Sequence, residues 1–217
     1  MKAGTCYAST MCPAKWVPVS AIVVAAGLAT RMGEPKQLLP YGKHTVIEQI
    51  VSVLLKCPLG EVVVVTGHER QAIEDRLAAW PVRPVFNPNY HHGEMLSSIQ
   101  CGLSVLGPEV HAALIVLGDQ PQLEAGVVRR VVEAYQEIQR GLIIPSFHMR
   151  RGHPILIDRG FWQEILALDS DRTLRDVIDT HADEIHYVAV ETDSVLRDID
   201  TPEEYQRELS RLGNFGR

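Results

Sequence analysis

Short apolar runs alternate with longer amphipathic stretches along most of this chain. The runs at 21–25, 61–66 and 112–117 are mainly apolar and rich in β-branched residues, as strands buried on both faces of a sheet are. Between the first two runs, residues 44–56 place apolar side chains at intervals of three and four, which is a helical pattern. Strands that alternate with helices at this spacing predict an α/β fold built on a parallel sheet.

The same patterns predict the remaining elements. Further helices are expected at 69–80, 95–106, 126–139, 161–168 and 173–181, and further strands at 83–86, 142–144, 155–157, 186–190 and 195–199. The last helix should begin with a capping box, with Thr201 as N-cap, Pro202 as the first helical residue and Glu204 as the third. No repeat or linker interrupts the pattern. We therefore expect one domain at 19–217, after a loose N-terminal extension at 1–18.

Composition narrows the classes of partner. The chain has 217 residues, 46% of them apolar, and a formal net charge of −6, which disfavours a nucleic-acid or anionic-membrane surface. It has neither a membrane-spanning apolar run nor a signal peptide, so we expect a cytoplasmic protein without membrane contact. Its cysteines, Cys6, Cys12, Cys57 and Cys101, lack C-x-x-C spacing, and we expect neither disulfides nor a metal site from them.

A glycine-containing loop follows the first strand and offers a place for phosphate. It holds Gly27, Arg31, Gly33 and Lys36. Small residues let the backbone amides approach an anion, and the two cations can neutralise a triphosphate. The spacing of its glycines matches neither the dinucleotide fingerprint nor the Walker A motif, so spacing alone leaves an ordinary turn with solvated charges as the alternative.

Polar residues also follow the other predicted strands. Gly67, Asn87, Asp119 and Asp200 stand at strand ends, and the carboxyl ends of parallel strands form one edge of a sheet, where ligands bind. Two carboxylates there could hold Mg²⁺ for phosphoryl chemistry. Asp119 could instead start a turn, and Asp200 could be a residue that favours the helix dipole. Asp198 shares the predicted strand face with Asp200, so the choice between these two acids stays open.

Other chemistries have weaker support. The histidines, among them His91, His92, His148 and His153, show no zinc-ligand spacing and read as surface and loop residues. No G-x-S-x-G elbow supports a Ser-His-Asp hydrolase. A dinucleotide-dependent dehydrogenase would need a glycine fingerprint and a later acid that this chain lacks.

With these residues in view, the chain resembles the MobA-like nucleotidyltransferases, and most closely their molybdenum cofactor cytidylyltransferase branch. The matching segments span about residues 20 to 205, and their order and spacing are more specific than any single motif. They are 25–33 with Lys36, 87–98, 117–121, 151–154 and 198–202. The resemblance implies a three-layer Rossmann-like fold with a mostly parallel sheet, of the nucleotide-diphospho-sugar transferase type.

The resemblance also implies a Mg²⁺-dependent transfer of a nucleoside monophosphate from an NTP to a phosphorylated acceptor, with release of pyrophosphate. Lys36, Arg31 and Asp119 would be catalytic, and Asp119 and Asp200 would bind the metal. The acceptor side would include Gly152, His153 and Pro154. The nucleotide pocket would comprise Ala25, Ala26, Gly27, Arg31, Met32, Gly33, Lys36, Gly67, Asn87, Gly93, Ser98 and Asp119.

The acceptor implied by the resemblance is molybdopterin, with a molybdoenzyme or a cofactor-insertion chaperone as a possible protein partner. Guanylyl-transferring relatives carry Gly where this chain has Ala26, and a methyl group in the base pocket would favour CTP over GTP. The segment 171–175 differs from its counterpart in the molybdopterin enzymes, and 35–37 also suits sugar- and alditol-phosphate nucleotidyltransferases. Two alternatives therefore remain: the same fold with another NTP and acceptor, and a non-catalytic nucleotide-binding or cofactor-chaperone protein.

Overall fold

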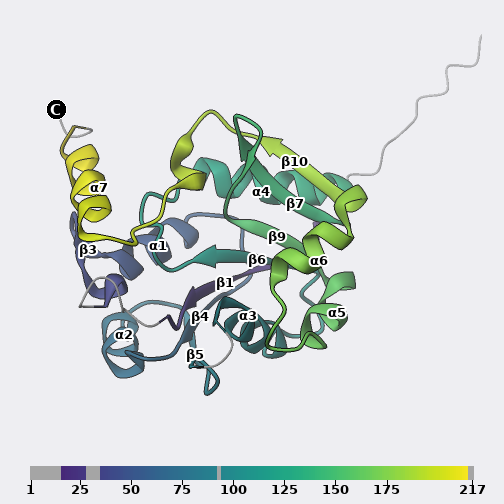
Figure 1. Cartoon of the computed structure of the whole chain (residues 1–217), viewed down its shortest axis with the longest axis horizontal. Helices are drawn as coiled ribbons and strands as arrows, with labels where there is room; N and C mark the ends of the chain where they lie inside the picture. Colours follow the sequence, from purple (N-terminus) through teal and green to yellow (C-terminus); the bar gives the residue numbers. More distant parts are fainter. Residues whose placement is uncertain (1–15, 28–34, 92–93, 215–217) are drawn as a thin grey trace, which may run out of the picture.

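An eight-stranded sheet lies at the centre of the computed structural model, which describes residues 16–27, 35–91 and 94–214 (Figure 1). The strands lie in the order β10-β7-β9-β6-β1-β4-β5, and β8 pairs with β7. Their bounds are β1 Val19–Ala25, β4 Val62–Thr66, β5 Arg83–Phe86, β6 Ala112–Leu117, β7 Leu142–Phe147, β8 Arg150–Arg151, β9 Ile155–Asp158 and β10 Ile185–Ala189.

Most strand pairs are parallel, as predicted. β1 lies between β4 and β6, with Val23 opposite Val64 on one side and Val116 on the other, and β7 pairs in parallel with β10. The exceptions are β9, which is antiparallel to both β6 and β7, and the short strand β8, which is antiparallel to β7. Only the short strand β8 and its flanking loops separate β9 from β7, and a parallel return would need a longer crossover.

Helices cover both faces of the sheet, which confirms the three-layer prediction. Successive residues of β1 point to opposite faces, so Val23 joins the core beneath one helical layer and Ile22 the core beneath the other. The first layer contains α1 Val46–Leu54, α2 Arg70–Leu77, α4 Ala125–Ile138 and α7 Pro202–Asn214. The second contains α3 Glu94–Ser104, α5 Trp162–Leu166 and α6 Leu174–Thr180.

The helix predicted at 44–56 begins two residues later than expected. Its first residues instead form β3 (His44–Thr45), which pairs with β2 (Pro40–Tyr41) in a small hairpin. Glu48 then accepts hydrogen bonds from the backbone and side chain of Thr45, at 2.7 and 2.8 Å, and this capping box starts α1.

The predicted strand at 195–199 is wrong. The segment begins in a short 3₁₀ helix, η4 (Asp193–Leu196), and its remaining residues pair with no described strand. The Thr192 hydroxyl accepts a hydrogen bond from the amide of Ser194, and this local bond favours a turn over a ladder. The predicted start of α7 is confirmed, because Glu204 accepts from the Thr201 amide at 2.9 Å.

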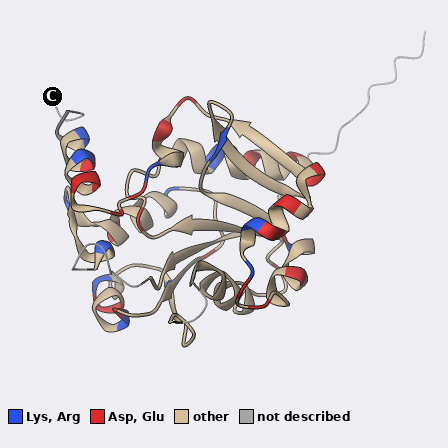
Figure 2. Ribbon diagram, in the orientation of Figure 1, with Lys and Arg blue, Asp and Glu red and all other residues tan. Residues whose placement is uncertain are grey.

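The helices and the distribution of charge can be compared with the expectations from composition. The described helices are all too short or too polar to cross a bilayer. Figure 2 shows acidic and basic residues interspersed, on α7 for example, rather than gathered by sign.

Candidate functional site

A cavity of about 510 Å³ opens beside the carboxyl ends of β1 and β6. These two parallel strands are neighbours and end at the same edge of the sheet, which is where ligands bind in open parallel sheets. The cavity is lined by Val24, Gly27, Lys36, Gln37, Met95, Ser98, Leu117, Gly118, Asp119 and Asp200.

Lys36 lies between two carboxylates in this cavity. It begins the 3₁₀ helix η1 (Lys36–Leu38), and its Nζ donates a hydrogen bond to Asp200 Oδ1. The same Nζ lies 3.6 Å from Asp119 Oδ2. The side chains of Lys36, Asp119 and Asp200 are 15%, 27% and 38% exposed, so the group is sheltered but open to a ligand. The three residues thus meet, as their predicted positions at one sheet edge require.

The surroundings of Asp119 make its negative charge costly. Its pKa is raised to about 6, mainly by burial and also by the nearby Asp198 and Asp200, while the charge of Lys36 lowers it. Asp119 Oδ1 is buried and has no hydrogen-bond partner. A buried, unpaired carboxylate oxygen beside a second carboxylate is a position that a cation would satisfy.

Asp198 is placed differently from Asp200. Its side chain lines a separate cavity with Glu204 and does not line the one that holds Lys36. Burial and then the charges of Asp200 and Glu204 raise its pKa. The geometry therefore pairs Asp200, rather than Asp198, with Asp119.

Hydrogen bonds hold in place the two segments that carry Asp119 and Asp200. The amide of Ile199 donates to the carbonyl of Asp119 at 3.1 Å, and the amide of Asp200 donates to Glu204 Oε2 at 2.9 Å. Gln122 Nε2 donates to the carbonyl of Arg197 at 2.5 Å. The bonds of Ile199 and Arg197 join the loop after β6 to the segment that precedes α7.

The donor set fits a divalent cation bound jointly with a substrate. Hard carboxylate oxygens suit Mg²⁺, which commonly takes one or two protein carboxylates and completes its shell with phosphates and water. Within the described residues, no group of three or more His, Cys, Asp or Glu side chains is arranged to hold a metal ion. Asp119 and Asp200 would thus supply two of the ligands of such an ion, and phosphates and water the others.

Ala25 and Ala26 stand beside the cavity but do not line it. Each is 2% exposed. A Cβ on Gly67 would lie 2.5 Å from the Ala26 carbonyl and 2.7 Å from its methyl group, so Gly67 permits a close approach of the two loops. The Ala26 methyl therefore packs toward Gly67, another residue that the resemblance assigns to the nucleotide pocket.

Asn87 is also buried, and it hydrogen-bonds two serines, one of which lines the cavity. It is 1% exposed, and its Nδ2 donates to Ser97 Oγ at 2.9 Å and to Ser98 Oγ at 3.1 Å. Its Oδ1 accepts from the amide of Asn89. Ser98 itself lines the cavity. Asn87 therefore positions the start of α3 and does not itself face the site.

The segment assigned to the acceptor forms a second, smaller cavity. Gly152 and His153 line a space of about 150 Å³, whereas Pro154 is buried behind it. Gly152 lets its segment pass close to the backbone of Val195, because a Cβ on Gly152 would lie 2.5 Å from the Val195 carbonyl. Burial lowers the pKa of His153 to about 4, so its imidazole is neutral near pH 7.

Four predicted nucleotide-pocket residues, Arg31, Met32, Gly33 and Gly93, lie outside the described residues. Conversely, Gln37 and Met95 line the cavity without having been predicted. Gln37 adjoins Lys36 and could have been proposed from that position. Met95 is a single apolar residue near the start of α3, and no sequence pattern marks it as part of a site.

Comparisons with known proteins agree with this geometry. The family model described as the MobA-like NTP transferase domain matches residues 21–185. A nucleotidyl transferase from Methanothermobacter has a TM-score of 0.79 at 25% identity, over 92% of this chain and 99% of that one. Such neighbours confirm the predicted nucleotide-diphospho-sugar transferase type of fold.

Two curated relatives cover nearly the whole domain. The molybdenum cofactor cytidylyltransferase of Escherichia coli (strain K12) is 27% identical over 190 residues, which is 86% of this chain and 93% of that protein. The nicotine blue oxidoreductase of Paenarthrobacter nicotinovorans is 30% identical over 201 residues, or 88% of this chain and 96% of that protein. Together with the family match, these relatives show that the chain belongs to the MobA-like NTP transferase family.

Proposed function

We propose that this protein transfers CMP from CTP to the phosphate of molybdopterin, in a Mg²⁺-dependent reaction that releases pyrophosphate. The observation that carries the proposal is the position of Lys36 between Asp119 and Asp200, inside a cavity at the carboxyl ends of parallel strands. A binding protein without catalysis would not need two sheltered acids beside a lysine, because their mutual repulsion makes the folded state less stable.

In the proposed reaction, a phosphate oxygen of the acceptor attacks the α-phosphorus of the nucleotide. A new P–O bond forms as the bond to the bridging β-phosphate oxygen breaks, and pyrophosphate leaves with that electron pair. Lys36 would release its carboxylates and stabilise the charge on the leaving group. Little covalent work falls to the protein, so positioning and electrostatics determine the rate.

Asp119 and Asp200 would hold the divalent ion, which when bound supplies positive charge at the phosphates. The buried, unpartnered Asp119 Oδ1 supports this role. Asn87 would keep Ser98 in the cavity wall, and Gly152 and His153 would face the acceptor.

The choice of CTP and of molybdopterin is supported by a relative and by one residue. The E. coli protein is named a molybdenum cofactor cytidylyltransferase. The Ala-Ala-Gly sequence at 25–27 resembles the cytidylyl-transferring rather than the guanylyl-transferring relatives. Because the Ala26 methyl packs toward Gly67, its effect on the choice of base would depend on the close approach of these two residues.

The proposal is tested by offering molybdopterin with each of the four NTPs and Mg²⁺, and measuring pyrophosphate. We expect release with CTP well above that with GTP, and a loss of about a hundredfold or more in Asp119→Ala. If pyrophosphate is released only with a different acceptor, the proposed nucleotidyl transfer stands and molybdopterin is replaced as the proposed substrate. Nucleotide binding without release from any NTP, or nicotine blue oxidoreductase activity in its place, would refute the transferase assignment.

A further inference from the structure

Three cavities meet at Met95. This residue lines the cavity of Lys36 and Asp119, the 150 Å³ cavity beside Gly152 and His153, and a third cavity of about 280 Å³. Its side chain is 38% exposed. The residues from 170 to 174 form much of the wall of the third cavity. A molecule lying over Met95 would therefore reach the proposed nucleotide site from the side of α6.

The cations of these cavities differ in what they already bind. Among described residues, four Lys or Arg side chains line the three spaces: Lys36, Arg151, Arg172 and Arg175. Lys36 contacts two acids, Arg151 pairs with an aspartate at 2.7 Å, and Arg172 lies 3.6 Å from another. Arg175 makes no ion pair or side-chain hydrogen bond within the part of the chain that the structure describes.

An acceptor phosphate needs such a free cation. Attack on a nucleotide triphosphate brings two anions together, and Lys36 is engaged on the nucleotide side of the proposed reaction. A guanidinium presents paired donors that match phosphate oxygens. Arg175 lines the same cavity as His153, whose ring is neutral and can donate a hydrogen bond without adding charge.

We propose that Arg175 binds the phosphate group of the acceptor, in the cavity between Met95 and His153. The inference rests on the proposed function and adds a recognition residue to it. The organic part of the acceptor would contact the apolar wall formed by Ile155 and Leu174 and extend into the neighbouring 280 Å³ cavity. The site thus requires a phosphate monoester and not only a suitable ring system.

The test uses Arg175→Gln, which removes the charge and keeps a polar side chain on α6. Arg140→Gln is the matched control, because Arg140 is another exposed arginine and lines none of the three cavities. Binding of molybdopterin is followed anaerobically by pterin fluorescence, and CTP binding by calorimetry. Arg175→Gln should weaken molybdopterin binding about tenfold or more, as expected for a lost charge-assisted hydrogen bond, and leave CTP binding unchanged.

The phosphate dependence identifies the contact. When the phosphate is removed from the pterin, wild type and Arg175→Gln should bind it equally weakly. A penalty that persists without the phosphate, the same penalty in Arg140→Gln, or no molybdopterin binding by the wild type would overturn the inference. Pyrophosphate release is scored separately: phosphate-dependent binding through Arg175 without any release would refute the proposed function and leave this inference standing.

Discussion

Replacing Lys36 with methionine should separate metal binding from turnover. In the structure the Lys36 ammonium occupies the space between Asp119 and Asp200, so a divalent ion that binds there must displace it. Methionine keeps much of the length of the side chain and removes the charge. We therefore expect Lys36→Met to bind Mg²⁺ more tightly than the wild type in the absence of nucleotide, although it turns over at least about a hundredfold more slowly.

The size of the effect follows from the contact geometry. Unit charges 3.6 Å apart, the separation of Lys36 Nζ and Asp119 Oδ2, attract by about 1 kcal/mol in bulk water and by about 5 kcal/mol at an effective dielectric constant near 20. The carboxylates of Asp119 and Asp200 are 27% and 38% exposed, so solvent screening reduces the upper figure. A cost of about 1–2 kcal/mol for displacing the ammonium corresponds to roughly a five- to thirtyfold gain in Mg²⁺ affinity.

The assay is a calorimetric titration with MgCl₂ at pH 8. This pH is chosen because the pKa of Asp119 is raised to about 6, and loss of the Lys36 charge raises it further. Lys43→Met is the control, because Lys43 is exposed in the turn between β2 and β3 and lines none of the cavities around Asp119. Mg²⁺ binding that is unchanged or weaker in Lys36→Met, or equally strengthened in Lys43→Met, would refute the reasoning.

Three further outcomes are expected. Gly67→Ala should lower the melting temperature, because its Cβ would approach backbone at 2.5 Å. Gly27→Ala, whose Cβ would have no atom of the described residues within 4 Å, should keep the wild-type melting temperature and weaken CTP binding, and equal melting temperatures for both variants would contradict this. Glu208 is 4% exposed, accepts a hydrogen bond from Arg211 at 2.7 Å and lies 3.3 Å from the Arg197 guanidinium, so Glu208→Ala should cost about 1–3 kcal/mol in urea unfolding, and a loss below about 0.5 kcal/mol would count against the network. A hydrogen bond to Glu164 raises the pKa of His181 in the folded protein. The charged imidazole therefore stabilises the folded state fully at a pH below its unfolded pKa of about 6.5, and this stabilisation is lost as the pH rises through the folded pKa. His181→Gln should therefore cost less than about 1 kcal/mol at pH 5.5 and nothing at pH 9, and a larger cost at the higher pH would reverse the sign.

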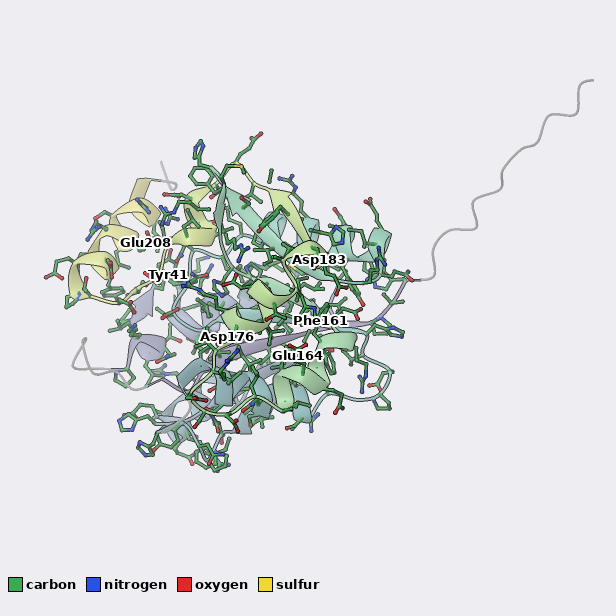
Figure 3. All side chains as sticks on the ribbon, turned by 45° about the vertical axis from the view of Figure 1, so that its right-hand side comes forward. Tyr41, Phe161, Glu164, Asp176, Asp183 and Glu208 are labelled. Atoms are coloured by element: carbon green, nitrogen blue, oxygen red, sulfur yellow. The ribbon has the colours of Figure 1, made fainter. Side chains whose placement is uncertain are left out.

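The network beneath α7 connects the last helix to the proposed site. Figure 3 shows Tyr41 and Glu208 close together where α7 meets the rest of the molecule, and burial followed by the charge of Glu208 raises the pKa of Tyr41 to about 12. Glu208 lies 3.3 Å from Arg197, one residue before Asp198. Loosening α7 is therefore expected to disturb the segment that carries Asp200, even though Glu208 does not line the cavity.

The central strands and the acids near them could be predicted from local pattern. An uninterrupted apolar run such as 112–117 has few alternatives to a buried strand, and Asp119 stands two positions after its end. The parallel sheet followed from the regular alternation with helices. Lys36 and Asp200 were expected at the same edge, and they meet although 164 residues separate them in sequence.

Other features depend on contacts that the sequence does not display. Residues 195–199 read as a strand from their apolar positions, yet the local bond at Thr192 and the backbone contact of Ile199 with Asp119 hold the segment in another conformation. Met95 and Arg175 lie 80 positions apart by numbering, and only packing of α3 against the α5–α6 region brings them to one cavity. Their part in the proposed acceptor site could not have been derived from spacing.

The most direct measurement is a crystal structure with Mg²⁺ and a non-hydrolysable CTP analogue. The account predicts one ion coordinated by both Asp119 and Asp200 at about 2.0–2.1 Å, with Lys36 moved from these acids onto the phosphates. An ion bound to neither acid, or Lys36 still hydrogen-bonded to Asp200 while the nucleotide occupies the cavity, would contradict it.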